Sequence, residues 1–202
     1  MCIKNKKELI QRIEAGEKFE YILFCDYRPK QNGIPDESCL SQWYESPFMI
    51  NQPIPGELFE ITFKTAEHYM MYKKAHLFYD YATAYKIVKA KTPKEAKELG
   101  RQVKNFDQKI WDDNSRSIVL SANLNKFYQT PLHEYLLDTE DKILVETNPN
   151  DSVWAVALDK NDQRVLNPKE WLGENRLGFI LMKVREILKI QDKHYLEEYI
   201  GW

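Results

Sequence analysis

The chain has 202 residues, and it carries 29 Lys and Arg against 31 Asp and Glu, for a formal net charge of -2. This length favours a single domain over residues 1–202, and a hydrophobic content of 43% is typical of a globular protein rather than of a disordered chain. The near-neutral balance excludes nucleic-acid binding that rests on bulk positive charge.

Two further features of the sequence limit the classes of protein to which the chain can belong. The chain has no run of about 18 apolar residues and no apolar stretch near its N-terminus, so we expect a soluble cytoplasmic protein with no membrane partner. Cys2, Cys25 and Cys39 lack CxxC spacing, and the four His form no HExxH pattern. We therefore expect no metal site, no disulfide framework and no cofactor.

The first predicted elements are a helix, a strand and a long loop. Asn5 and Glu8 have the spacing of a capping box, and Gly16 marks the end of the helix that they begin. Residues 19–27 are apolar and aromatic, which favours a strand. The prolines and glycines of residues 28–57 predict a loop with little regular structure, and loops of this length are often functional.

A second strand and helix follow. Phe59, Ile61 and Phe63 alternate with polar residues, which predicts a short strand. Thr65 has the position of an N-cap, and the sequence after it predicts a helix over residues 66–79.

Threonine-proline pairs mark the starts of two further helices. Thr92 and Pro93 precede a predicted helix over residues 94–106, and Thr130 and Pro131 precede a shorter one. After them, the β-branched residues 143–147 and 152–158 predict two short strands, and the apolar residues between Leu177 and Leu188 recur at helical spacing. The pattern therefore predicts an α+β fold in which helices are in the majority.

The helix after Thr65 carries two charges on an apolar stripe. Glu67 and Lys74 share one side of the helix with Met70, Met71 and Phe78. The Cα atoms of Glu67 and Lys74 lie about 10 Å apart along the helix axis. A lysine held among apolar neighbours has a lowered pKa and becomes a nucleophile for Schiff-base chemistry, while the helix dipole favours the ionised form of Glu67. Alternatively, both side chains reach solvent at the edge of a core helix.

Three other places are candidates for ligand contacts. Asp151 and Trp154 lie at the start of a predicted strand, where they are either ligand contacts or a turn residue and a core anchor. Gly173 and Asn175 precede the last helix, where backbone amides can bind phosphate and Asn175 can either cap the helix or face a ligand. Arg101 can bind phosphate or form a surface salt bridge.

Taken in order, several blocks of sequence resemble the YbiA-like or NADAR family. They are residues 40–48, 65–75, 92–103, Trp111, 126–130, 138–147, 151–158 and 171–185, the last being the most specific. The resemblance covers residues 40–185. It implies the family's fold and carries its motif residues over to Glu67, Lys74, Trp111, Asp151, Trp154 and Asn175.

The chain departs from the family pattern at two places. Residues 41–45 read Ser-Gln-Trp-Tyr-Glu where the family has an SNFYP stretch, and residues 154–157 read Trp-Ala-Val-Ala where it has WGIG. The two alanines add methyl groups where a ligand can approach the backbone closely, so we expect a change in substrate size or in activity.

The resemblance implies N-glycosidase activity, and the residues suggest how it would proceed. A neutral Lys74 would attack C1 of an opened ribose and expel the base, with Glu67 as the proton shuttle, or Glu67 would stabilise an oxocarbenium ion while Lys74 only orients. Asp151 would hold ribose hydroxyls. The ring of Trp154 or of Trp43 would stack on a base. Phosphate would contact Arg101 and the amides near Gly173.

The expected partner is a ribose phosphate or ADP-ribose linked to a base, either as a small molecule or on single-stranded DNA that carries the modified base. ADP-ribosylated guanine is favoured slightly over an early riboflavin intermediate, because the long aromatic loop offers room for a second ring. Two other classes stay open: a non-catalytic reader of ADP-ribose or a nucleotide, and an interaction protein that docks a partner on residues 28–57.

Overall fold

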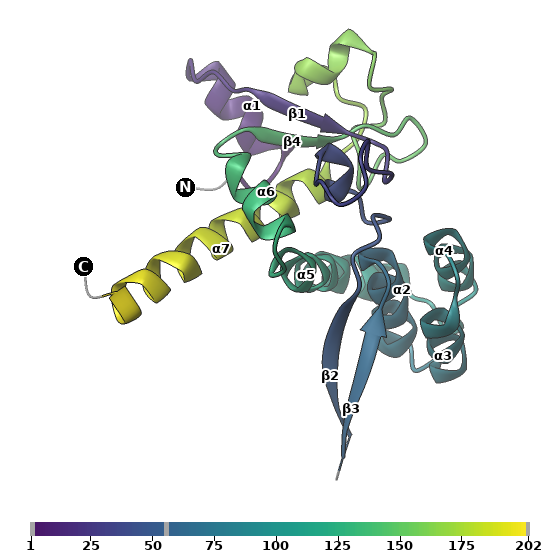
Figure 1. Ribbon diagram of the computed structural model, residues 1–202. Coiled ribbons are helices and arrows are strands. Elements are labelled where there is room, and N and C mark those ends of the chain that lie inside the picture. The colour runs from purple at the N-terminus through teal and green to yellow at the C-terminus, as the bar shows by residue number, and fades with distance from the viewer. Residues whose placement is uncertain (1–2, 55–56, 201–202) are drawn as a thin grey trace. The chain divides into compact units, whose positions relative to one another are not determined.

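The computed structural model describes residues 3–54 and 57–200, with the side chains of residues 3–51 and 60–192 (Figure 1). The chain forms two compact units: the first comprises the residues up to Ser41 and from Phe127 onward, and the second comprises Gln42–Lys126. Helices predominate over a few short strands, which confirms the α+β prediction. The single domain over 1–202 stays a prediction. Within the described ranges, no helix is both long and apolar enough to cross a membrane.

The first unit is built on two parallel strands from distant parts of the chain. Tyr21 pairs with Ile143, and Phe24 pairs with Glu146. The elements of this unit are α1 (Lys6–Glu14), β1 (Tyr21–Phe24), η1 (Glu37–Leu40), α6 (Leu132–Asp138), β4 (Ile143–Glu146), η2 (Gln163–Leu166), η3 (Pro168–Glu170) and α7 (Arg176–Ile200). Apolar side chains of both strands and of α7 are fully buried and form the core of this unit.

Helix α7 packs against β4 at very short range, and a glycine makes this possible. A Cβ atom at Gly178 would lie 2.0 Å from the carbonyl oxygen of Leu144, inside van der Waals contact. Only a residue without a side chain fits between this helix and this strand. Leu177 and Leu181, which are completely buried, continue the contact along α7.

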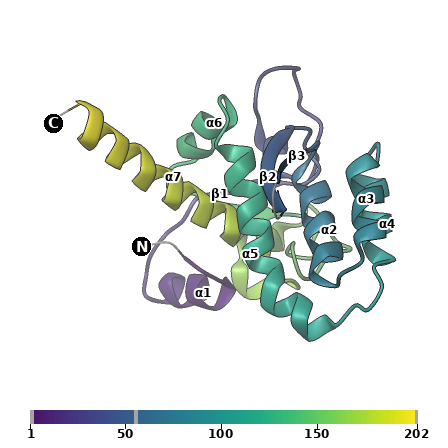
Figure 2. The ribbon, with the colours of Figure 1, turned by 90° about the horizontal axis from the view of Figure 1, so that it is seen from below.

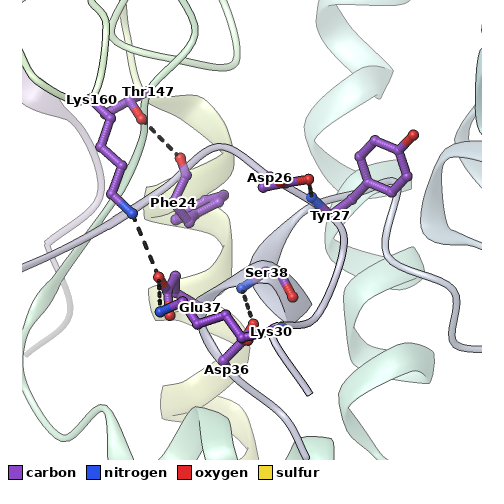
Figure 3. Close-up of polar contacts among 9 residues, drawn as sticks. All are labelled: Phe24, Asp26, Tyr27, Lys30, Asp36, Glu37, Ser38, Thr147 and Lys160. Carbon is purple, nitrogen blue, oxygen red and sulfur yellow. Dashed lines mark hydrogen bonds and ion pairs between the residues drawn. The ribbon is translucent and has the colours of Figure 1, made fainter. Parts of the chain in front are cut away.

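Polar contacts hold the segment that follows β1, as Figure 3 shows. The Glu37 carboxylate forms ion pairs with Lys30 at 2.7 Å and with Lys160 at 3.5 Å. Asp36 accepts a hydrogen bond from the backbone N–H of Ser38 at 2.9 Å, which caps η1. The hydroxyl of Thr147 donates to the carbonyl of Phe24 at 3.2 Å. Hydrogen bonds within the segment and ion pairs, one of them with the distant Lys160, therefore hold this segment, although it contains little regular structure.

The second unit contains four helices and a hairpin, and aromatic side chains pack between the hairpin and the first of these helices. The hairpin pairs β2 (Phe48–Ile54) with β3 (Glu57–Phe63) in antiparallel register. The helices of this unit are α2 (Ala66–Leu77), α3 (Tyr81–Lys89), α4 (Pro93–Arg101) and α5 (Gln108–Phe127), which extends by one residue into the first unit. Rings of Phe48, Phe63, Tyr69 and Tyr72 contact one another where the hairpin meets α2. Both views place α3 and α4 on one side of α2 and α5 on the other (Figures 1 and 2).

Several predicted helix starts are confirmed. Asn5 Oδ1 accepts from the backbone N–H of Glu8, and the Thr65 and Thr92 hydroxyls accept from the third residue of α2 and α4. The strand over residues 59–63 is confirmed within β3, and β4 and α7 are also confirmed.

Other predictions need correction. The strand predicted over 19–27 is limited to Tyr21–Phe24, and the helix predicted over 94–106 ends at Arg101. Residues 28–57 contain β2, because both strands of a two-stranded hairpin are edges that tolerate a proline such as Pro53. Thr130 does not cap α6: Pro131 occupies the N-cap position, and no side chain caps this helix.

The strand predicted over residues 152–158 is also wrong. This segment is a series of bends, and Ala157 has a φ of 55°, in the left-handed region that an extended strand does not use. Its carbonyl groups accept hydrogen bonds from residues 172–177 instead of from a neighbouring strand.

Candidate functional site

Lys74 lies over two aromatic rings in the second unit. Its Nζ is 4.3 Å from the centre of the Phe106 ring and 5.5 Å from the centre of the Trp111 ring. Trp111 is at the start of α5 and is buried, whereas Phe106 is in the loop between α4 and α5. The lysine itself is half-buried. Rings from two other segments of the second unit thus flank the amine, which is partly removed from solvent.

The pKa of Lys74 is lowered by these surroundings. Burial disfavours the ammonium form and is the largest cause, and the positive charge of Arg101 lowers the pKa further. The negative charge of Glu67 acts in the opposite direction but does not reverse the shift. The side chain therefore holds a larger fraction of neutral amine near neutral pH than an exposed lysine does.

Glu67 lies in the first turn of α2, seven residues before Lys74. It is 5% exposed, and its backbone N–H donates to the carbonyl of Gln42 at 3.0 Å. The Nδ2 of Asn123 on α5 donates to Gln42 Oε1 at 2.9 Å, so the start of α2 is connected to α5 through this glutamine. The predicted apolar stripe exists: Met70, Met71 and Phe78 are buried beside the two charged residues.

A row of basic side chains on α4 continues from Lys74. Lys97 and Arg101 are one turn apart on α4, and Nζ of Lys97 is 5.8 Å from the centre of the Trp43 ring. Within the described part of the chain, neither cation forms an ion pair. The salt bridge considered for Arg101 is thus not formed there, and both charges can bind an anionic ligand.

Asp151 and Trp154 are close together in the first unit. Asp151 Oδ1 accepts hydrogen bonds from the backbone N–H groups of Val153 at 2.9 Å and Trp154 at 2.8 Å, which forms a turn. The Trp154 side chain is only half-buried, so it is not the core anchor considered as an alternative. The predicted contacts of these two residues with a ligand stay predictions.

The amides around Gly173 do not have the geometry of a phosphate site. The N–H of Gly173 donates to the carbonyl of Val156 at 2.9 Å, and each neighbouring N–H from Leu172 to Leu177 also donates to a backbone carbonyl of residues 152–156. A Cβ at position 173 would lie 2.3 Å from the carbonyl oxygen of Ala155. The predicted phosphate role of these amides is therefore wrong, because the close approach of two backbone segments uses all of them.

Asn175 holds β4 in place. Its Nδ2 donates to the carbonyl of Leu144 at 2.9 Å, and its Oδ1 accepts from the N–H of Glu146 at 3.0 Å. The residue is completely buried and has a φ of 52°, a conformation that Asn adopts more readily than most residues. The predicted helix cap is therefore wrong, because both polar groups of the side chain bond to the strand, while the predicted contact with a ligand stays a prediction.

Two residues of the candidate site were missed in the sequence. Phe106 falls inside a predicted helix, but in the structure it lies in a loop. A loop has no periodicity from which the contact of Phe106 with Lys74 could be predicted. Lys97 had a readable signal: it precedes Arg101 by four residues on a predicted helix, so the two had to share a face.

Comparison with known proteins identifies the family. The NADAR domain matches residues 27–189, which runs through both units. The chain is a member of the NADAR domain family. N-glycosidase R617 of Acanthamoeba polyphaga mimivirus is 36% identical over 171 residues, which are 84% of this chain and 97% of the viral protein. N-glycosidase YbiA of Escherichia coli is 30% identical over 131 residues, which are 64% of this chain and 73% of that protein.

The solved structure of one of these relatives has a similar fold. The NMR structure of Escherichia coli YbiA superimposes with a TM-score of 0.62 at 25% sequence identity, and the match covers 87% of this chain and 89% of that chain. The second glycine of the family's WGIG stretch corresponds to Ala157. Ala157 has a φ of 55°, a conformation that glycine adopts without strain and that the Cβ of alanine disfavours.

Proposed function

We propose that the protein is an N-glycosidase that cleaves the bond between a phosphorylated ribose and a base, with Lys74 as the nucleophile. Membership of the NADAR family and the N-glycosidase names of its relatives support the reaction class. One observation carries the choice of residue: the half-buried amine of Lys74 has a lowered pKa and interacts electrostatically with the carboxylate of Glu67.

The reaction begins with the opening of the ribose ring. The bond between C1 and the ring oxygen breaks, the oxygen takes a proton, and C1 becomes an iminium joined to the amine nitrogen of the base. The neutral Lys74 then adds to C1, and the bond from C1 to the base nitrogen breaks as that nitrogen takes a proton. The product of this step is the free base and a Schiff base between C1 and Nζ of Lys74.

Water completes the reaction. It adds to C1, the bond from C1 to Nζ breaks, and the sugar leaves as an aldehyde that closes again to the ring. Each step moves one proton, and Glu67 is the group proposed to carry it, because it is the buried carboxylate on the same helix. Phe106 and Trp111 exclude water from one side of the amine, which keeps Lys74 partly neutral.

Borohydride trapping tests the covalent step, and Lys73 provides a matched control. Lys73 is also half-buried with a pKa lowered by burial, but its Nζ lies 5.6 Å from the ring of Tyr69, away from Trp111. We expect a reduced ribose adduct on Lys74 in the wild type and in Lys73→Ala, and no adduct in Lys74→Ala. Turnover without any adduct in the wild type would contradict the Schiff base and favour an oxocarbenium route in which Lys74 only orients.

For the substrate we propose ADP-ribosylated guanine. The half-buried ring of Trp43, the cation of Lys97 beside it, and Arg101 one turn further along α4 form a row that ends at Lys74. A row of this kind has the order of groups that ADP-ribose presents: adenine for the ring, a diphosphate for the two cations, and ribose for the amine. A single phosphate would need only one of the two cations.

Substrate assays separate this proposal from the alternatives. We expect Lys97→Gln to raise KM for ADP-ribosylated guanosine while leaving KM for a monophosphate substrate unchanged. Turnover of a phosphoribosylated riboflavin precursor alone would replace ADP-ribosylated guanine as the substrate. Binding of ADP-ribose in calorimetry, with no hydrolysis of any ribosylated base, would mean that the protein is a reader and not an enzyme.

A further inference from the structure

Three tyrosines around the start of α3 are unusually exposed. Tyr79 is 78% exposed, Tyr81 is 56% exposed and Tyr85 is 67% exposed. Tyrosine normally buries most of its ring, and single exposed apolar groups need no explanation. Three exposed rings within seven residues are a cluster of exposed aromatic side chains, and such clusters are typical of interaction sites.

The same segment is locally basic although the chain as a whole is not. Residues 79–94 contain Lys86, Lys89, Lys91 and Lys94 and one acidic residue, Asp80, whose side chain is buried. Lys86 and Lys89 are exposed on α3 beside the tyrosines, and Nζ of Lys89 is 5.7 Å from the centre of the Tyr85 ring. The charge pattern therefore favours an anionic partner for this face.

The helix spaces these groups regularly. Tyr81, Tyr85 and Lys89 follow one another at intervals of four residues, which corresponds to about 6 Å along the axis. The opposite side of α3, with Ala84 and Ile87, is buried against the rest of the second unit. Rings and cations thus share the face that points to solvent.

Two of the three tyrosines have distinctive surroundings: the ring of Tyr81 packs on another ring, and the backbone of Tyr79 is left-handed. Tyr81 packs edge-on against His76 at 5.1 Å, and His76 lies against the buried ring of Tyr72 at 4.3 Å. Tyr79 has a φ of 58°, the left-handed conformation in which helices usually end with glycine. An exposed tyrosine at such a position is unfavourable for folding, which points to another use of its ring.

We infer that the tyrosine-lysine surface, made of Tyr79, Tyr81, Tyr85, Lys86 and Lys89, binds single-stranded nucleic acid. Unpaired bases stack on exposed aromatic rings whatever their sequence, while nearby lysines contact the phosphates. A duplex hides its bases from such rings, and the charge of the lysines beside the tyrosines complements the phosphates of a nucleic acid. This inference goes beyond the proposed function, which concerns the bond that is cleaved and does not require a polymer.

Fluorescence anisotropy with a labelled oligonucleotide of twelve thymidines tests the inference without any hydrolysis. We expect the wild type to bind the single strand and to bind a duplex of equal length more weakly. Tyr85→Ser should weaken binding about 5-fold or more, since one stacked base contributes roughly 1–3 kcal/mol. The double variant Lys86→Gln/Lys89→Gln should reduce the slope of log affinity against log salt by about 0.7 for each lysine.

Matched variants elsewhere on the chain serve as controls. Tyr128→Ser removes a tyrosine that is 69% exposed in the first unit, and Lys7→Gln/Lys18→Gln removes two exposed lysines there. Both should leave binding unchanged. Tyr79→Gly relieves the left-handed backbone, so it should keep at least the wild-type Tm and still weaken binding.

Two results would overturn the inference: no binding of the single strand by the wild type, or equal losses in the control variants. Loss of N-glycosidase activity in Lys74→Ala with intact oligonucleotide binding would leave the inference standing. Conversely, an inactive wild type that binds the oligonucleotide would refute the proposed function alone.

Discussion

Replacement of Asn175 tests whether this residue supports the fold or contacts a ligand. The side chain makes two buried hydrogen bonds to β4, one with Leu144 and one with Glu146. Loss of each partner costs about 1–3 kcal/mol. Alanine at a φ of 52° adds about 1 kcal/mol, because its Cβ disfavours the left-handed conformation. For Asn175→Ala we therefore expect a loss of roughly 3–7 kcal/mol in the free energy of unfolding.

Asn175→Gly separates the two contributions. Glycine loses the same hydrogen bonds but accepts the positive φ, so it should be more stable than alanine by about 1 kcal/mol. Urea unfolding followed by tryptophan fluorescence measures both variants, and amide exchange of Glu146 reports the local effect on β4. The reasoning would be refuted if alanine and glycine were equally stable, or if each lost less than about 1 kcal/mol. A residue that only bound ligand would change KM and leave unfolding unaffected.

Two further predictions concern the second unit. Arg101→Gln removes a positive charge that lowers the pKa of Lys74, so the pKa of Lys74 should rise. The ascending limb of the pH–rate profile, where the amine becomes neutral, should then move to higher pH. An unshifted limb would contradict the role of the neutral amine. Gly100→Ala would place a Cβ 2.1 Å from Sδ of Met71, so we expect a loss of about 1–3 kcal/mol in thermal unfolding, whereas Glu98→Ala on the exposed side of α4 should change stability by less than about 0.5 kcal/mol.

The helices could be predicted from sequence because their signals are local. Asn5, Thr65 and Thr92 cap helices where their spacing indicated, since a side-chain oxygen and an N–H three residues away meet in any such helix. The stripe of Glu67 and Lys74 followed from helical geometry in the same way. The lowered pKa of Lys74 was expected from its apolar neighbours, but the contribution of Arg101 depends on how α4 lies against α2.

The later segments could not be predicted in the same way. Residues 152–158 have a strand-like composition, yet their carbonyl groups pair with residues 172–177, a contact between distant segments that composition does not encode. That pairing uses the amides near Gly173, which were expected to bind phosphate. Asn175 was expected at a helix start, whereas its two hydrogen bonds with β4 depend on the approach of α7 that Gly178 permits.

The pairing of β1 with β4 has a consequence for the order of folding. The register joins Tyr21 to Ile143, so the first unit cannot complete its sheet until more than half of the chain has been synthesised. In the sequence, the second unit falls entirely between these two strands, and all of its residues are available for folding once Lys126 has left the ribosome. We therefore expect it to fold during translation, while the N-terminal segment waits for a strand that is made much later.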